Sequence, residues 1–383
     1  MQKALSNRLE YPCLKTHSYL NQASLGLIGE PAVAAMSDFL DNTARHGNLH
    51  MSDAQEAAFL QPLRGNVSRL IGCAPEKLAI VSSASEILAQ VPTLFAPKPK
   101  SKIITVASDF PAITRPWISA CHLMNCQMVF VDDVAEQKLT RAIIDQIDAQ
   151  TAAVCVSYVQ FSTGTCLDIP MLRKATSKVG AKLVVDITQA AGALAFSVHD
   201  WQADIIVASG YKWLGGHGGI GFAVLSDELL HKQPPFIGWF GGEDPFDMDA
   251  KTLMLAKTAA KYTQSTLSYI TAMGLKASVD ELLKLGLENI DGHSQKLASA
   301  LISGLNGSDW TPFQGPESPG FSPHIVTLQN PSCDARATEA SLMDNRIICS
   351  IRNGRVRVSL AHYNSKDDVD ALINSLHQPM RLD

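Results

Sequence analysis

The 383-residue chain lacks several features that would place it in other classes of protein. It has no run of lysines and arginines, and its formal net charge is -5, so we do not expect a nucleic acid or an anionic membrane as its main partner. No stretch approaches the roughly 20 apolar residues of a membrane helix. The first ten residues also lack the apolar core of a signal peptide, which predicts a cytoplasmic protein.

The 8 cysteines lack the spacings of a metal site or of a disulfide framework. No two of them form a CxxC pair, and no histidine spacing suggests zinc. Several lie in apolar runs that are typical of strands, such as Cys155. We therefore predict reduced, buried thiols and no metal site.

Repeats, low-complexity tracts and flexible linkers are absent too, and 46% of the residues are hydrophobic, enough for two domains with sizeable cores. Over residues 17–282, short β-branched runs alternate with helical patterns, which indicates a large domain with a mainly parallel sheet. Its expected strands are 103–106, 128–131, 153–159, 183–185 and 205–208. Residues 1–16 and 283–383 are expected to form a smaller α+β domain, with strands at 325–328 and 356–360 and a final helix from Lys366.

One lysine, Lys212, lies between a strand-like run, residues 204–208, and a glycine-dense segment. It is expected at the C-terminal end of a strand, where open α/β sheets bind ligands. A lysine desolvated there can hold an aldehyde as a Schiff base. Residues 216–221 fit the letters GxGxxG, but a strand is expected after them instead of a helix, so we do not predict a dinucleotide site. Taken alone, the glycines fit a simple tight turn equally well.

Asp186 ends another apolar run, residues 182–186, one strand and one connection before Lys212. Both side chains should emerge at the same edge of a parallel sheet. A lone aspartate after a strand usually caps a helix or starts a turn. Beside a Schiff-base lysine it has a chemical role, because pyridoxal phosphate withdraws electrons only while a carboxylate keeps its ring nitrogen protonated.

The segments VVDITQAAG (184–192) and SGYKWLGGHGG (209–219) resemble the class V aminotransferase family of fold-type I pyridoxal-phosphate enzymes. That family includes cysteine desulfurases, kynureninases, isopenicillin N epimerases and cystine C-S lyases. Further matches follow in order along nearly the whole chain, at YLNQASLG (19–26), VSSASEIL (81–88), DFPAITRPW (109–117), VQFSTG (159–164) and GRVRVSLAHYNSKDDVD (354–370). The resemblance implies an α/β fold of type I, with a mainly parallel large domain and a smaller α+β C-terminal domain. It also implies a homodimer with the active site at the subunit interface.

The resemblance assigns three catalytic residues. Lys212 would form the Schiff base with pyridoxal 5'-phosphate, Asp186 would pair with the pyridine nitrogen, and Gln189 would hydrogen-bond the phenolic oxygen. Phe110 falls where the family stacks an aromatic or histidine on the pyridine face, and its Phe-Pro setting is similar to kynureninases. Ordinary core packing is the alternative for this phenylalanine.

The SSASEIL segment reads as a turn that opens a helix, so the backbone N–H groups of Ala84 and Ser85 and the Ser85 hydroxyl could face a phosphate. An N-cap serine without a ligand is the alternative. The resemblance adds Ser209 and Tyr211 to this cofactor-binding set. In the family, a Gly-Thr pair of the neighbouring subunit normally adds a contact to the phosphate. The resemblance therefore also adds Thr266, although Ser265 replaces the glycine of that pair here.

Arg357 matches the arginine of the family's RxS pattern and would bind the substrate carboxylate, for which a guanidinium is suited. A solvated arginine on an edge strand is the alternative. Desulfurases of the family carry a catalytic cysteine on an extended loop before this arginine, but here only residues 353–356 separate it from Arg352. Cys349 lies in an apolar run, and Phe161 stands where desulfurases tend to have asparagine. We therefore do not expect a desulfurase.

The reaction itself stays open at this stage. Members of the family form an external aldimine with an α-amino acid, and the geometry of the site selects the bond that breaks. We expect Lys212 to remove the α-proton of the substrate, and aminotransferase-type chemistry is the reaction that we favour. The alternatives are a β-eliminating C-S lyase, a kynureninase-like hydrolase and a non-catalytic paralogue that binds pyridoxal phosphate. Against the hydrolase, Gln189 stands where kynureninases usually have histidine.

Overall fold

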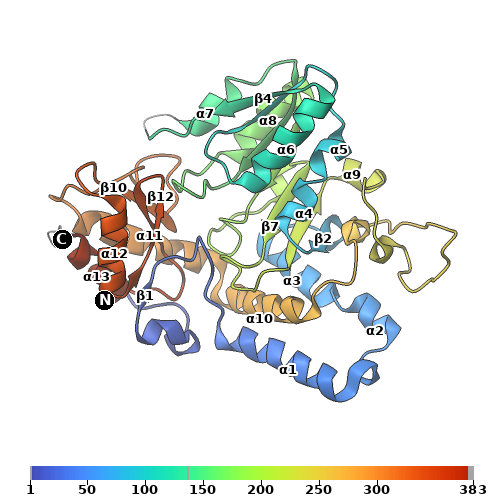
Figure 1. Cartoon of the computed structure of the whole chain (residues 1–383), viewed down its shortest axis with the longest axis horizontal. Helices are drawn as coiled ribbons and strands as arrows, with labels where there is room; N and C mark the ends of the chain where they lie inside the picture. The colour runs from blue at the N-terminus through green and yellow to red at the C-terminus, as the bar shows by residue number, and fades with distance from the viewer. Residues whose placement is uncertain (1, 136–137, 378–383) are drawn as a thin grey trace.

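The computed structural model describes residues 2–135 and 138–377 and contains a large and a small unit (Figure 1). A seven-stranded sheet in the order β2-β8-β7-β6-β5-β3-β4 forms the centre of the large unit. Only β8 runs against its neighbours, β7 and β2. The strands are β2 (Leu78–Val81), β3 (Lys102–Val106), β4 (Gln127–Val131), β5 (Thr151–Ser157), β6 (Lys182–Asp186), β7 (Ile205–Ser209) and β8 (Gly221–Leu225).

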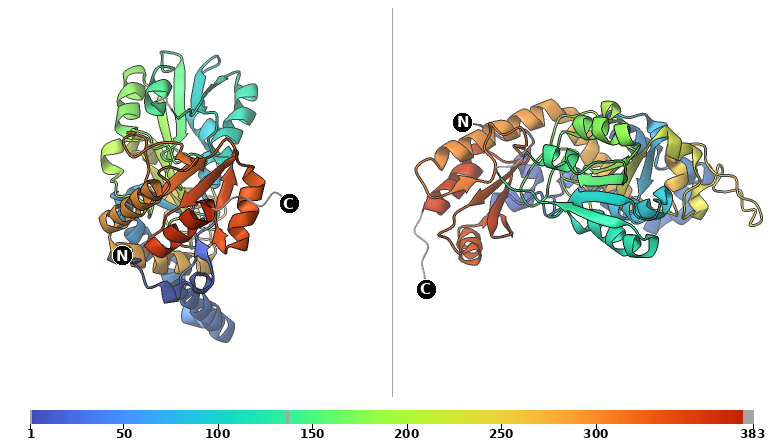
Figure 2. Two further views of the ribbon diagram at one scale, coloured as in Figure 1. Left: turned by 90° about the vertical axis from the view of Figure 1, so that its left-hand side faces the viewer. Right: turned by 90° about the horizontal axis from the view of Figure 1, so that it is seen from above.

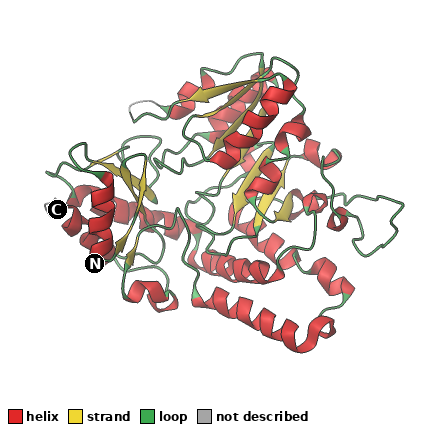
Figure 3. Cartoon of the chain, in the orientation of Figure 1, coloured by secondary structure: helices red, strands yellow, loops and turns green. Residues whose placement is uncertain are grey.

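Helices bury both faces of this sheet (Figures 1 and 3). Alternate side chains of one strand enter opposite cores: Ile206 and Ala208 of β7 belong to one core, Ile205 and Val207 to the other. This two-sided burial explains why the strands read as nearly continuous apolar runs. The helices that contribute side chains to the first core are α3 (Gln61–Ile71), α7 (Leu139–Ile144), α8 (Ile169–Val179) and α10 (Tyr269–Leu285). Those that contribute to the second core are α4 (Ala84–Leu88), α5 (Val91–Phe95), α6 (Pro111–Met124) and α9 (Asp227–His231). Two further helices precede α3, α1 (Glu30–His46) against α10 and the short α2 (Asp53–Ala58).

The small unit has its own core around an antiparallel sheet in the order β12-β13-β10-β9. Its strands are β9 (Thr311–Pro312), β10 (Ile325–Gln329), β12 (Ser350–Arg352) and β13 (Arg355–Ser359), and its helices are α11 (Leu287–Gly304), α12 (Ala335–Asp344) and α13 (Lys366–His377). The expected fold class, a mainly parallel large domain with a smaller α+β domain, is confirmed. The boundaries at residues 16 and 283 stay a prediction.

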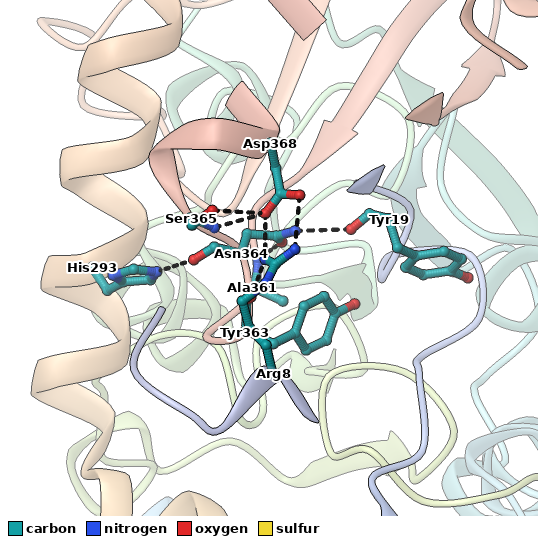
Figure 4. A network of polar contacts seen from close by, with 8 residues as sticks. All are labelled: Arg8, Tyr19, His293, Ala361, Tyr363, Asn364, Ser365 and Asp368. Atoms are coloured by element: carbon teal, nitrogen blue, oxygen red, sulfur yellow. Dashed lines mark hydrogen bonds and ion pairs between the residues drawn. The ribbon is translucent and has the colours of Figure 1, made fainter. Parts of the chain in front are cut away.

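The N-terminal segment is attached to the small unit by a strand pairing and by an ion pair (Figure 2). Strand β1 (Ser18–Tyr19) pairs in parallel with β11 (Ile347–Ile348). Figure 4 shows Arg8 reaching Asp368 at the start of α13, with its Nη1 also donating to the Tyr363 carbonyl at 2.8 Å. The described residues include no helix that is long and apolar enough to cross a membrane. Within the same residues no group of three or more His, Cys, Asp or Glu side chains is placed to hold a metal ion.

Candidate active site

Lys212 follows β7 and is buried at the C-terminal edge of the large sheet, with 5% of its surface exposed. Burial lowers the pKa of its amine to about 8, the Asp186 carboxylate opposes this shift, and Arg357 adds to it. Its Nζ lies 5.0 Å from the centre of the Phe110 ring. An amine of this kind loses its proton around pH 8, well below an ordinary lysine, and can then act as a nucleophile or as a base.

Asp186 is the last residue of β6, which pairs in parallel with β7. Burial raises the pKa of its carboxyl, whereas hydrogen bonding with Thr188 and the charge of Lys212 lower it. The backbone N–H of Thr188 donates to Asp186 Oδ1 at 2.7 Å. The prediction that this aspartate and Lys212 emerge at one edge of a parallel sheet is confirmed, and both line the same pocket.

A short N-terminal segment holds the turn that carries Lys212. Gln22 Nε2 donates to the Lys212 carbonyl at 2.9 Å, and the N–H of Gly26 donates to the Tyr211 carbonyl at 2.9 Å. A Cβ on Gly26 would lie 2.3 Å from the Lys212 carbonyl oxygen, so a larger residue would displace the turn. Tyr363 of the small unit donates to Gln22 Oε1. The backbone of the lysine is therefore connected to the small unit through this segment.

Small residues and hydroxyl groups line another part of the pocket. Ser83 caps α4, which is only five residues long, and Ala84 and Ser85 open it. The N–H of Ala84 donates to Ser209 Oγ at 3.2 Å, which joins α4 to the end of β7. A Cβ on Gly221 would lie 2.5 Å from a β7 carbonyl oxygen and 3.4 Å from the Ala84 nitrogen. Glycine at this position therefore lets the Ser83–Ala84 turn approach the strand closely.

Two aromatic rings, Phe110 and Phe161, line the same pocket edge to face, with their centres 5.4 Å apart. Asp109 is buried beside them and accepts hydrogen bonds from the N–H groups of Phe110 and Ser157 at 2.7 and 2.8 Å. It also accepts from Ser157 Oγ at 2.6 Å and from Gln160 Nε2 at 3.3 Å. One carboxylate therefore fixes both the start of α6 and the loop that carries the second ring.

Burial raises the pKa of Asp109 to about 6 from 3.8, which gives a prediction for stability. A carboxyl with a raised folded-state pKa contributes stability below pH 3.8, and this contribution is lost as pH rises through 6. We expect the free energy of unfolding of wild type, relative to Asp109→Asn, to fall by about 2 kcal/mol between pH 4 and pH 7. Urea unfolding of both proteins across this range measures it. A difference that does not change with pH would contradict the assignment.

Two guanidinium groups of the small unit converge on one hydroxyl of the N-terminal segment, that of Ser24. Arg357 is 1% exposed, and its Nη1 donates to the Phe161 carbonyl at 2.6 Å while its Nη2 donates to Ser24 Oγ. Arg352 Nη2 also donates to Ser24 Oγ, at 3.1 Å. Burial, together with the neighbouring charge of Arg352, lowers the pKa of Arg357 to about 9. Neither arginine has a carboxylate partner among the described residues, and Arg357 Nε is buried without a hydrogen bond there.

The pocket brings together most of the site residues that the sequence predicted. Those that line it are Ala84, Ser85, Phe110, Asp186, Gln189, Ser209, Tyr211 and Lys212. Arg357 does not line this pocket, although its charge helps to lower the pKa of Lys212. Thr266 is exposed and does not line this pocket, so its contact with a neighbouring subunit stays a prediction.

Several residues of the site were not singled out from the sequence. Asp109 and Thr188 each stand within two residues of a predicted site residue. Their polar side chains beside a motif could therefore have indicated that they belong to the site. Ser24 lies within the YLNQASLG segment, but its arginine partners are more than 300 residues away in the chain. No local pattern reports such a contact.

The pocket suits the cofactor that the resemblance implies. The Lys212 amine matches an aldehyde, and the buried Asp186 carboxylate matches a protonated ring nitrogen. The hydroxyls of Ser83, Ser85 and Ser209 offer hydrogen bonds to a phosphate. Residues of the right chemistry for pyridoxal phosphate therefore line one cavity.

Known proteins with similar sequences match the chain over nearly its whole length. An uncharacterised aminotransferase of Bacillus subtilis, YcbU, is 26% identical over 373 residues, which cover 96% of this chain and 95% of the relative. A probable cysteine desulfurase of Pyrococcus abyssi is 24% identical over 391 residues, 97% of this chain and 96% of the relative. The sequence model of the aminotransferase class-V family matches residues 18–372.

Two solved structures share the fold. A cysteine desulfurase of Thermococcus onnurineus superposes with a TM-score of 0.84 at 22% identity, over 96% of this chain and 95% of that one. The cystine C-S lyase C-DES, in complex with cysteine persulfide, gives a TM-score of 0.85 at 17% identity, over 96% of this chain and 98% of that one. The family match identifies the chain as a member of the class V aminotransferase family, whose enzymes depend on pyridoxal 5'-phosphate.

Proposed function

We propose that the enzyme acts on an α-amino acid by removing its α-proton, with transamination as the first candidate reaction and β-elimination as the second. The observation that carries the proposal is the buried Lys212 amine, whose pKa is lowered to about 8, in the same pocket as the buried Asp186 carboxylate. A pair of groups whose environments shift their proton affinities suits proton transfer. Both candidate reactions begin with this proton transfer.

Pyridoxal phosphate, when bound, supplies an electron sink for the carbanion that proton removal leaves at the α-carbon. Lys212 would hold the cofactor through its Nζ, and the same Nζ would take the α-proton of the substrate. Asp186 holds the proton of the ring nitrogen through its carboxylate, and Gln189 offers an amide N–H to the phenolic oxygen. Phe110 covers one face of the site and excludes water from it. The serines of the α4 turn, with Tyr211, bind the phosphate.

Arg357 binds the substrate carboxylate in this proposal. It is buried and has no anionic partner among the described residues, which is costly unless an anion binds there. Ser24 Oγ accepts from both Arg357 and Arg352, so its two lone pairs are occupied. Its O–H proton is therefore free to donate to the same carboxylate. Three donors from two parts of the chain would then orient the substrate.

The proposal includes a cytoplasmic homodimer with the active site at the subunit interface. The segment around residues 236–254 leaves the body of the molecule as a long loop (Figures 1 and 2) and exposes large apolar side chains. These are Phe236, Trp239, Met248, Leu253 and Met254, each at least 45% exposed. An apolar loop of this kind is suited to contact a second copy of the chain. Thr266 follows the same loop and is available to such a partner.

A screen of amino acids against the purified holoenzyme tests the function. Spectral change reports binding, and the products decide the reaction: a keto acid with an aminated acceptor for transamination, and a keto acid with ammonia for β-elimination. One observation favours a C-S lyase over a desulfurase: Cys349, whose pKa is affected by Arg357, links two strands and does not lie on an extended loop. A protein that binds pyridoxal phosphate but changes no amino acid would support the non-catalytic alternative instead.

We predict that any cysteine or cystine turnover proceeds without a protein persulfide. Burial raises the pKa of Cys349 to about 12, so the thiol is protonated at physiological pH, and the residue links β11 to β12 instead of lying on an extended loop. Cys349→Ser should therefore keep the wild-type product, pyruvate with ammonia, within about twofold of the wild-type rate. Mass spectrometry of products and protein measures this. Alanine formed together with a persulfide on Cys349, both lost in the variant, would contradict it.

A further inference from the structure

Gln189 is held at three points by different parts of the chain. Trp213 Nε1 donates to Gln189 Oε1 at 2.8 Å, and Gln189 Nε2 donates to the Ala23 carbonyl at 3.0 Å. His324 Nε2 lies 2.6 Å from the Gln189 backbone carbonyl oxygen. All four residues are buried, so water does not compete for these contacts.

These contacts fix which end of the Gln189 amide faces which neighbour. An indole N–H only donates and a backbone carbonyl only accepts. If the amide turned over, its NH2 would face the Trp213 N–H and its oxygen would face the Ala23 carbonyl, and both hydrogen bonds would become repulsions. The oxygen therefore points to the indole. The second N–H of the amide has no partner among the described residues, and Gln189 lines the pocket.

His324 supports this arrangement without adding a charge. Its ring packs edge to face on Trp213, with the ring centres 4.6 Å apart. Its Nε2 carries the proton, because the partner is a carbonyl, and its Nδ1 is buried without a partner in the described part of the chain. Burial lowers the pKa of His324 to about 4, so the ring is neutral at physiological pH.

We propose that Trp213 is a positioning residue that keeps one Gln189 N–H directed into the pocket, as a donor to the phenolic oxygen of the cofactor. The inference rests on the proposed function, in which pyridoxal phosphate is attached at Lys212. A donor at this oxygen stabilises its negative charge, so the Lys212 nitrogen joined to the cofactor loses its proton at lower pH. Trp213 thus tunes that protonation without touching the cofactor.

Other charged or titratable groups face the Lys212 nitrogen from several elements. They are Asp186 of β6, Tyr211 beside the lysine, Arg352 of β12 and Arg357 of β13. None of them hydrogen-bonds the Trp213 indole, whose N–H goes to Gln189. A substitution that removes only this N–H leaves all of those charges in place.

Trp213→Phe tests the inference in the holoenzyme. We expect the midpoint of the pH titration of its visible absorption to rise by about 1 pH unit, because a hydrogen bond to a charged oxygen has roughly this effect. Gln189→Ala should give a similar rise, and the double variant should add little to it, because both changes remove one interaction. Replacement of Trp213 by benzothienylalanine keeps the bicyclic shape but lacks the N–H, and it should reproduce the shift even if Trp213→Phe does not fold.

Trp117→Phe is a matched control. The indole N–H of Trp117 is also buried, but it donates to Cys155 Sγ at 3.1 Å, and the residue does not line the pocket. This variant should lose stability without a shift in the titration. An unchanged midpoint in the benzothienylalanine protein, with a normal titration in wild type, would overturn the role of Trp213. A wild-type protein without the lysine-linked absorption would instead overturn the proposed function.

Discussion

Replacement of Lys212 by alanine is expected to abolish the borohydride-reducible visible absorption and to lower turnover by roughly 10⁴-fold, the upper range for loss of a catalytic base. The effect should be this large because one nitrogen both attaches the cofactor and takes the α-proton. The turn itself should persist, since it is held by backbone contacts from Gln22 and Gly26 that do not involve the amine.

The same substitution should not destabilise the cofactor-free protein through charge. A lysine whose pKa falls from 10.5 to about 8 on folding lowers the free energy of unfolding below pH 8, because the charged amine must be buried. This destabilisation decreases as pH rises to 10.5. Alanine removes that destabilisation, so any loss of stability reflects only the cavity that it leaves. Thermal unfolding of both proteins at pH 7 and above pH 10 separates the two contributions.

Lys261 offers a matched control for the lysine. It is equally buried, at 5% exposure, but its Nζ donates to the Leu230 carbonyl, outside the pocket. Lys261→Ala should keep the lysine-linked absorption and the turnover of wild type. Reduction that labels a lysine other than Lys212 in the wild-type protein would refute the attachment site.

The elements of the large sheet and the residues at their ends could be predicted from the sequence, because local patterns determine them. Strands such as β6 and β7 are buried on both faces, so they appear as short β-branched runs, and their C-terminal residues fall at one sheet edge. For this reason Asp186 and Lys212 could be placed together without a structure. The helix that opens within SSASEIL followed from local chemistry too, and Ser83 is its N-cap in the structure.

Contacts between distant segments could not be predicted in this way. β1 is only two residues long and pairs with a strand more than 300 residues later, so neither partner has a recognisable pattern. The orientation of the Gln189 amide depends on Trp213 and Ala23, and the position of Ser24 depends on two arginines of the small unit. Such geometry arises when the two units pack, and it supplies the groups that would select the substrate.

Asp186→Asn is expected to lower turnover by roughly 10²–10³-fold, the scale seen when an electrostatic partner of developing charge is removed. Asparagine keeps the size of the side chain but cannot hold a proton on the ring nitrogen, so the carbanion would no longer be delocalised into the ring. Cofactor should still bind, because the lysine and the serines of the α4 turn are unchanged. Stopped-flow measurement of α-proton exchange with solvent isolates the affected step.

A second consequence can be measured without the cofactor. The Asp186 carboxylate raises the pKa of Lys212 against the effect of burial, so its neutralisation should lower that pKa further. The pH dependence of Lys212 labelling by an amine-specific reagent should therefore shift to lower pH in Asp186→Asn. Asp204→Asn is a matched control, since Asp204 is buried at the other end of β7 and pairs with Arg173 instead. Near-normal turnover in Asp186→Asn, with Lys212 labelling unshifted, would mean that another group holds the proton of the ring nitrogen.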